Sequence, residues 1–413
     1  MNSTITAAIS QFLDQHAGEQ IDFLRALVRT PADNPPGDCA PHAQVTARLL
    51  EQLGFQVERH PVPPALCADH SMRSATNLIA RTVFGQGPVI ALSAHGDAVR
   101  PGDGWTFDPY GGEIADGYLY GRGAAVSKSD IATYAYAILA LKALSPMPGG
   151  TLELHVTYDE EAGGYIGPRR LLDEGLTRPD YAICPGFSYD VVTGHDGVLH
   201  LEVSVAGKSA HAAWPETGFD ALEAATRVLE ALYQHRKGYR NIRSGVPGIE
   251  SPTLVVGLIQ GGINTNVVPD KVTFRLDRRM IPEERPDEVE AALREVIDGA
   301  VKACPGITVE VARLIVAHPL VPSEASIQMA DVLKRHASEV FGTSVGTCGV
   351  PLYTDARHYA SAGVPTILYG TGPKDPLDAN VHRANERIRV SDLRQATEVV
   401  ARFVYDWLSG VRA

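Results

Sequence analysis

The sequence lacks the features of a disulfide-stabilised, nucleic-acid-binding or membrane-spanning protein. Its five cysteines contain no CxxC pair, which favours reduced thiols in a reducing compartment. Acidic residues outnumber basic ones, the net charge is -12, and no basic stripe is present, so we expect no nucleic-acid partner. No stretch of about 18 consecutive apolar residues occurs, and the start carries neither a basic n-region nor a long apolar segment. We therefore predict no membrane association and a cytoplasmic location.

The chain has 413 residues, more than one hydrophobic core usually supports, so two domains are expected. Short apolar runs rich in β-forming residues alternate with amphipathic helical stretches, a pattern typical of an α/β fold with a largely parallel mixed sheet. The predicted strands are Val89–Ala94, Leu152–Tyr158, Tyr181–Ile183 and Thr366–Tyr369, and the predicted helices are Pro41–Leu53, Ile131–Leu144 and Ser391–Leu408.

A different pattern of apolar and polar residues lies between about Gly197 and Arg313. Half-buried alternating runs occur there, together with two helical patterns, Phe219–His235 and Pro286–Lys302. This indicates a smaller α+β domain at 197–313, inserted into a catalytic domain formed by 1–196 and 314–413.

Polar residues follow the predicted strands where each strand ends. His95-Gly96-Asp97, Asp159-Glu160-Glu161, Cys184 and the loop from Gly370 to Gly372 each come directly after, or within two residues of, a buried run. Ligands bind outside the carboxyl ends of the strands in open α/β sheets. We therefore expect these segments to meet at one edge of the sheet and to form a site there.

The residue types at this edge suit a metal-assisted reaction. Asp97 can accept a hydrogen bond from the imidazole of His95 and so fix its tautomer, as in the usual surroundings of a metal-bound histidine. Glu160 and Glu161 are costly to bury unless a cation or a proton compensates them. One of them can bind metal while the other acts as a general base. A structural histidine and a solvated acidic turn remain the alternatives.

Five separated motifs together resemble the metallopeptidase and deacylase family of acetylornithine deacetylase, succinyl-diaminopimelate desuccinylase, aminoacylase and carboxypeptidase G. The resemblance covers nearly the whole chain, in order. The motifs are His95–Asp97, Trp105–Gly112, Gly121–Ala124, Asp159–Glu161 and Val381–Glu386.

The resemblance implies roles for individual residues. It places His95, Glu161 and His382 on metal, Asp97 behind His95, and Glu160 as the base that activates water and then protonates the leaving amine.

The inserted domain resembles the family's lid and dimerisation domain. Its segments Gly207–Ala213 and Gly261–Pro269 carry His211 and Asn266, and Asp277-Arg278-Arg279 follows them. The resemblance implies that His211, and with it Asn266 and Arg279, stabilises the oxyanion and holds a substrate carboxylate. It also implies a homodimer or higher homo-oligomer formed through this domain.

Two ligands that the family expects are missing. Val126 stands where an aspartate would bridge two metal ions, and Cys184 stands before Pro185 where a carboxylate is expected. Cys184 is either a thiolate ligand or a buried core thiol. Asp130 is either a substitute ligand or a first-turn charge favoured by the helix dipole.

The missing bridge matters because two dications about 3.5–4 Å apart need a shared anion to offset their repulsion. We therefore predict one firmly bound divalent ion per subunit, held by Glu161, His382 and either His95 or Cys184. Zinc is favoured, and manganese or cobalt is possible.

The predicted function is hydrolysis of a non-cyclic amide-like C–N bond in a small acylated amine or amino acid. Arg357 is either a clamp for a substrate carboxylate or a member of a surface ion pair. It precedes the strand that leads to the loop at Gly370, which is a further candidate for substrate contact. Hydrolytic deamination of an aromatic amine at the same site, and a catalytically inactive small-molecule-binding relative, remain alternatives.

Overall fold

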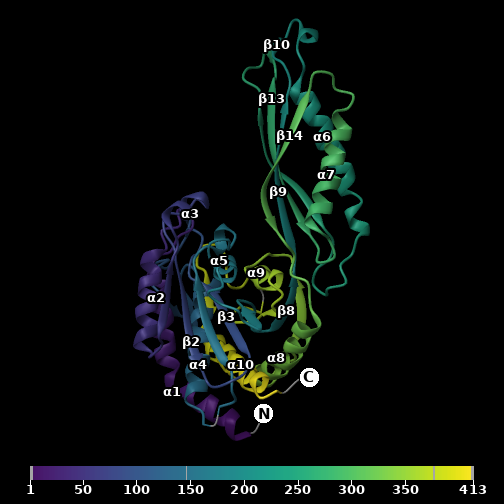
Figure 1. The fold of residues 1–413 in the computed structure, drawn as a ribbon. Helices are drawn as coiled ribbons and strands as arrows, with labels where there is room; N and C mark the ends of the chain where they lie inside the picture. Colours follow the sequence, from purple (N-terminus) through teal and green to yellow (C-terminus); the bar gives the residue numbers. More distant parts are fainter. Residues whose placement is uncertain (1–2, 146, 375–376, 411–413) are drawn as a thin grey trace. The chain divides into compact units, whose positions relative to one another are not determined.

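The computed structural model describes residues 3–145, 147–374 and 377–410, and the chain divides into two units (Figure 1). The first unit comprises residues 1–193, 322–347 and 354–413, and the second comprises residues 194–321 and 348–353. The predicted boundary at Arg313 falls inside strand β14 (Thr308–Ala317). This strand pairs with β9 (Gly197–Ala206) up to Ala317, so the second unit extends further than the sequence suggested.

The first unit is built on a mixed sheet with the strand order β1-β2-β6-β3-β7-β16-β8-β15. Its central strands β6, β3, β7 and β16 run parallel, whereas β1, β2 and β8 pair antiparallel with their neighbours. This confirms the predicted fold class. The strands are β1 (Val57–Pro61), β2 (Thr76–Val83), β3 (Val89–His95), β6 (Thr151–Thr157), β7 (Tyr181–Cys184), β8 (Asp190–His195), β15 (Gly346–Val350) and β16 (Thr366–Leu368).

Helices pack around this sheet and form one large apolar core with it. Helix α4 is buried on nearly all sides because it packs on β3, β6, α1 and α10, and its sequence is correspondingly apolar all round. The helices are α1 (Ser3–Val28), α2 (Ala40–Gln52), α3 (Pro64–Asp69), α4 (Ser129–Lys142), α5 (Pro168–Asp173), α8 (Glu324–Phe341), α9 (Ala356–Ser361) and α10 (Val390–Leu408).

A small three-stranded sheet also belongs to the first unit. It has the order β17-β5-β4 and joins the chain before α10 to the segment before α4. Its strands are β4 (Glu113–Ala115), β5 (Tyr118–Tyr120) and β17 (Arg387–Arg389).

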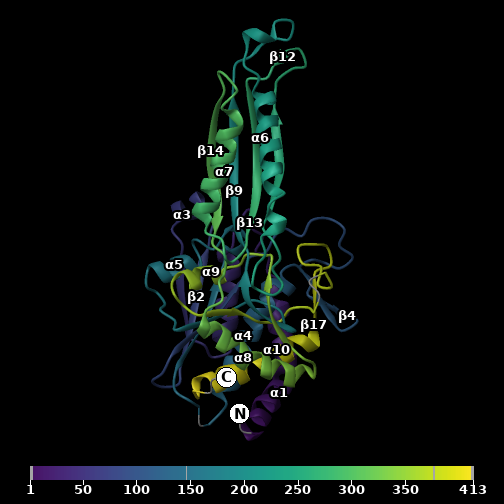
Figure 2. The same ribbon diagram turned by 90° about the vertical axis from the view of Figure 1, so that its right-hand side faces the viewer.

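The second unit is an α+β structure. Its antiparallel sheet has the order β11-β13-β9-β14, and helices α6 and α7 cover one face of it (Figures 1 and 2). A separate two-stranded sheet pairs β10 with β12. The elements not yet given are β10 (Ala210–His211), α6 (Ala221–Arg236), β11 (Thr253–Gly261), β12 (Val267–Val268), β13 (Lys271–Met280) and α7 (Pro286–Val301). Throughout the described parts of the chain, no helix has the length and apolar character needed to span a membrane.

Candidate active site

The parallel strands carry the predicted residues to one edge of the sheet. His95, the last residue of β3, is paired with Thr157, the last residue of β6. On the other side of β3, strands β7 and β16 end together, because Leu368 is paired with Cys184. The segments after these strands therefore start side by side, as the sequence pattern predicted.

His95 and Asp97 are both buried at this edge. The imidazole Nδ1 of His95 donates a hydrogen bond to the carbonyl oxygen of Asp97 at 3.0 Å, and the carboxylate Oδ1 of Asp97 lies 3.3 Å from the same nitrogen. The other oxygen, Oδ2, accepts hydrogen bonds from the side-chain amide of Asn34 at 3.0 Å and from the backbone N–H of Glu161 at 3.2 Å. Asp97 therefore connects the His95 segment to the segment of the two glutamates.

The charges around His95 determine its protonation. Burial favours the neutral imidazole, but the hydrogen bond with Asp97 and the carboxylates of Glu160 and Glu161 together raise the pKa of His95 well above its ordinary value. The buried Oδ1 of Asp97 makes no hydrogen bond to any described residue. Three carboxyl groups, those of Asp97, Glu160 and Glu161, thus act on the single imidazole of His95, and such a cluster of acids favours a bound cation.

Glu160 has the properties of a general base. Burial raises the pKa of its carboxyl to about 7, the charges of Glu161 and Asp97 act in the same direction, and His95 and Arg357 oppose them. A base of this pKa can accept a proton from water at neutral pH and return it to a leaving group.

Glu161 and His382 form a contact at the open side of the site. Nε2 of His382 lies 3.4 Å from Oε1 of Glu161, and this partnership raises the pKa of the histidine. The side chain of His382 is 53% exposed, and its backbone has a φ of 60°, a left-handed conformation uncommon for a residue with a side chain. His382 is therefore presented by a loop, whereas Glu161 lies in the helical turn Glu160–Ala162 that follows β6.

A buried ion pair anchors this loop. Glu386 accepts hydrogen bonds from Nη1 of Arg122 at 2.5 Å and from the backbone N–H of Ala125 at 2.9 Å. Arg122 also donates to the carbonyl of Arg383 at 3.1 Å. The segment that contains Val126 and the segment that contains His382 are thus tied together by residues for which the sequence analysis assigned no role.

The donor chemistry fits a divalent cation, because imidazole and carboxylate groups lie around an excess of buried negative charge. Glu161 and His382 are the paired donors, and His95 lies near both glutamates. However, among the described residues no group of three or more His, Cys, Asp or Glu side chains is arranged to hold a metal ion.

Cys184 and Asp130 both have structural surroundings. Cys184 is fully buried in β7, and burial raises the pKa of its thiol well above the ordinary value, so the core alternative is favoured. Oδ1 of Asp130 accepts a hydrogen bond from the backbone N–H of Thr371 at 2.8 Å. Asp130 is thus the acidic residue in the first turn of α4, and it is buried and holds the loop at Thr371.

Gly370 is required by this arrangement. A Cβ atom at this position would lie 1.7 Å from Oδ1 of Asp130, and the carbonyl oxygen of Gly370 accepts a hydrogen bond from Oγ of Ser188 at 2.9 Å. Any side chain here would displace the Asp130–Thr371 contact.

Arg357 is buried beside the site, so its interpretation as a member of a surface ion pair is wrong. Its guanidinium donates to the carbonyl oxygens of Thr354, at 2.8 Å, and of Gly163. Its neighbour Asp355 is a further buried acid of the site that the sequence pattern did not indicate. Burial raises the pKa of Asp355 to about 8, and Glu160 acts in the same direction. The sequence around Asp355 could have indicated its role, because an acid and an arginine two residues apart lie beside a strand of the site.

The remaining predicted residues lie in the second unit. His211 is exposed in β10, and its Nδ1 accepts a hydrogen bond from the backbone N–H of Ala213 at 3.1 Å. The backbone carbonyl of Asn266 accepts a hydrogen bond from the N–H of Ala212 at 3.0 Å. Asn266 itself is exposed. Arg279 contacts both carboxylate oxygens of Asp277, at 3.0 and 3.2 Å.

Comparison with known proteins gives consistent matches. A model of peptidase family M20/M25/M40 matches residues 91–406. The chain is 28% identical over 408 residues to a succinyl-diaminopimelate desuccinylase of Rhodospirillum centenum, covering 95% of this chain and 98% of the relative. It is 30% identical over 368 residues to an acetylornithine deacetylase of Myxococcus xanthus, covering 87% and 90%.

A solved structure has the same fold. It is a dinuclear metal binding peptidase of the M20 family from Bacillus subtilis, which matches with a TM-score of 0.69 at 17% identity and covers 96% of this chain and 100% of that chain.

Proposed function

Because the chain belongs to peptidase family M20/M25/M40, whose members hydrolyse amide bonds of peptides and acylated amino acids, we propose that it cleaves a non-cyclic amide-like bond in a small acylated amine or amino acid. The observation that carries this proposal is Glu160, a half-buried carboxyl whose pKa is raised to about 7 beside His95. A protein that only bound a small molecule would have no need for a base tuned to neutral pH.

The proposed mechanism uses the residues of the first unit. Glu160 accepts a proton from the attacking water and later donates it to the leaving amine. Asp97 holds His95 in place through the contacts on Nδ1, and Asp97 is itself held by Asn34. A divalent ion bound by Glu161, His382 and His95 would polarise the scissile carbonyl and lower the pKa of bound water. His211, Asn266 and Arg279 of the second unit stay proposed substrate-binding residues.

We further propose one divalent ion per subunit, with zinc favoured. Members of the family use divalent metals, and the Bacillus subtilis relative is a dinuclear metal binding protein. The proposal of a single ion is supported by Val126 at the position of the missing bridge and by the protonated, buried thiol of Cys184.

A homodimer is proposed through the second unit. Strand β11 lies at the edge of its sheet, so one row of backbone groups is free to pair with another chain. Three apolar side chains of this strand are more than half exposed, namely Val255 at 53%, Leu258 at 62% and Ile259 at 53%. An edge strand with exposed apolar side chains is typical of an interface.

The test of the function is identification of the products. We would incubate the purified protein with N-succinyl, N-acetyl and N-carbamoyl amino acids and with aromatic amines, each with zinc, manganese and cobalt in turn. A carboxylate and a free amine in equal amounts from the acyl compounds, or a free amine with carbon dioxide and ammonia from the N-carbamoyl compounds, support the proposal. Ammonia and a phenol from an aromatic amine, with no cleavage of the acyl compounds, would contradict it.

A further inference from the structure

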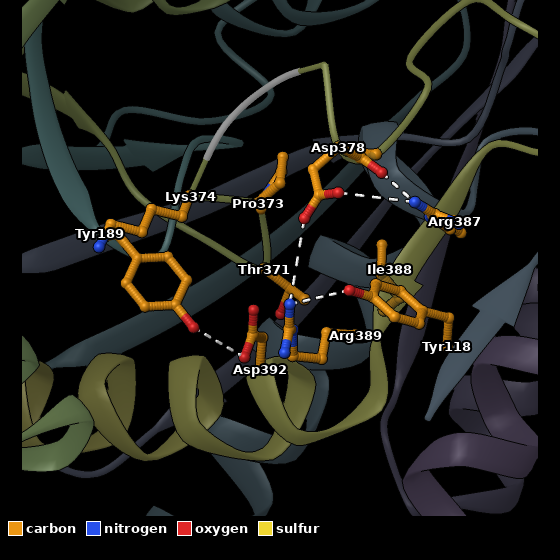
Figure 3. Close-up of a pocket in the computed structure, with 12 residues that line it drawn as sticks. Tyr118, Tyr189, Thr371, Pro373, Lys374, Asp378, Arg387, Ile388, Arg389 and Asp392 are labelled. Atoms are coloured by element: carbon orange, nitrogen blue, oxygen red, sulfur yellow. Dashed lines mark hydrogen bonds and ion pairs between the residues drawn. The ribbon is translucent and has the colours of Figure 1, made fainter. Parts of the chain in front are cut away.

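A cavity lies in the first unit, at the base of the loop that carries His382. Its volume is about 250 Å³, and its walls come from the loop after β16, from β5 and β17, and from the start of α10 (Figure 3). It is lined by Tyr118, Tyr189, Thr371, Gly372, Pro373, Lys374, Asp378, Ala379, Arg387, Ile388, Arg389 and Asp392.

Two walls of the cavity are the two stems of the His382 loop. The backbone N–H of Arg387 donates to the carbonyl of Ala379 at 3.0 Å, and Nε of Arg387 donates to the carbonyl of Asp378 at 3.0 Å. Between these stems Asn380, His382 and Asn385 all have left-handed backbone conformations, with φ of 50°, 60° and 59°. Such conformations persist only when the surrounding structure fixes them, so the spacing of the stems controls where His382 lies.

Arg389 occupies the middle of the cavity with few of its donors in use (Figure 3). Within the described residues its guanidinium makes one hydrogen bond, to the hydroxyl of Tyr118 at 2.8 Å. Oδ2 of Asp378 is 4.0 Å from Arg389, and Oδ1 is 3.5 Å from Nη2 of Arg387, distances too long for strong hydrogen bonds. A guanidinium has five N–H donors in a planar fork, so most of this fork is available to a ligand.

The charges of the cavity favour an anion. Lys374, Arg387 and Arg389 contribute three positive charges, against two carboxylates, those of Asp378 and Asp392. Asp392 already accepts hydrogen bonds from the hydroxyls of Tyr189 at 3.0 Å and of Ser391 at 3.3 Å. The lining therefore carries one positive charge in excess, and the guanidinium of Arg389, whose side chain is 51% exposed, is accessible to a ligand.

We propose that this cavity binds a small anion through the fork of Arg389, and that the anion holds the stems of the His382 loop together. The ligand class is a molecule with a carboxylate or phosphate group, because both match the planar fork with two parallel hydrogen bonds. Pockets for drug-sized ligands measure roughly 300–1,000 Å³, so the occupant of this cavity is smaller than that. The site is separate from the proposed hydrolysis and does not depend on it.

The experiment measures anion binding to the full-length, metal-free protein, with inorganic phosphate and succinate as separate probes. Titration calorimetry gives the affinity, and hydrogen exchange of residues 377–389 reports on the loop. We expect saturable binding of at least one probe, slower exchange in this segment, and at least a tenfold loss of affinity in Arg389→Met. Arg383→Met is the matched control, because Arg383 is an exposed arginine of the same loop that does not line the cavity.

Each outcome decides the question. Binding of phosphate alone assigns a phosphoryl ligand, and binding of succinate alone assigns a carboxylate ligand. Absence of saturable binding by either probe, equal affinity in Arg389→Met, or equal losses in both variants overturns the proposal. Arg389→Lys, which keeps the charge but lacks the fork, should bind with intermediate affinity if the protein is folded correctly.

Discussion

The candidate site has two halves that differ in how the chain supports them. His95 and Asp97 lie at the end of β3 and Glu160 lies shortly after β6, and hydrogen bonds fix the first two from several sides. His382 is instead presented by a loop, is half-exposed, and contacts Glu161 alone among the charged partners described for it. The residues around His95 are therefore held in fixed positions, whereas the His382 half can adjust to a ligand.

The largest expected effect concerns the base of the buried half. Glu160→Gln should lower kcat by about 10²–10⁴-fold, because the amide cannot accept the proton of water. Metal content, measured by elemental analysis, should not change. Glu174→Gln, which alters an exposed glutamate directly after α5, is the control and should leave kcat unchanged. Normal turnover by folded Glu160→Gln protein would show that Glu160 is not the base that activates water.

The pH dependence tests the environment of the same residue. Burial raises the pKa of Glu160 to about 7, so the carboxylate that acts as base is lost as the pH falls through this value. We expect kcat/KM to fall about tenfold per pH unit on the acid side, with a midpoint at or below 7, since a bound cation favours the ionised form. A rate that increases as the pH falls from 7 to 5 would contradict this assignment.

The two histidines provide a direct comparison of the halves. His95→Ala should lower the free energy of unfolding of the metal-free protein by about 1–3 kcal/mol, because it removes the imidazole that lies 3.3 Å from the buried Oδ1 of Asp97. His382→Ala should change it by less than about 0.5 kcal/mol, since the side chain is half-exposed. Urea denaturation measures both, and both variants should bind zinc more weakly. Equal destabilisation would mean that the loop half is as rigid as the strand half.

The smallest expected effect concerns metal stoichiometry. Replacing Val126 and Cys184 together by aspartate should raise the zinc content from one to two ions per subunit, because it restores the shared anion that offsets cation repulsion. Cys184→Ser is the control. It should leave the zinc content at one ion per subunit, because a buried thiol that is not a ligand does not contribute to metal binding. Two ions per subunit in the chelator-washed parent protein would refute the single-ion proposal.

The catalytic edge of the fold was predictable because strand and helix patterns are local. The buried runs at β3, β6, β7 and β16 were placed within about two residues, and each is followed by the polar residue that the pattern indicated. Long elements such as α1 and α8 were not identified. The roles of Asn34, Arg122 and Glu386 were also missed, because each depends on a partner distant in the chain.

The sequence by itself determined the α/β class, the family, and the residue types that meet at one edge of the sheet, since strand ends and motif spacing are properties of neighbouring residues. Only the tertiary structure decided which of those residues are buried, and burial sets their chemistry. It made Glu160 a base near neutral pH, kept Cys184 a thiol, and turned Asp130 and Arg357 into supports of the surrounding loops. A charge in water and the same charge in a dry interior differ in free energy by several kcal/mol, and local sequence does not contain that difference.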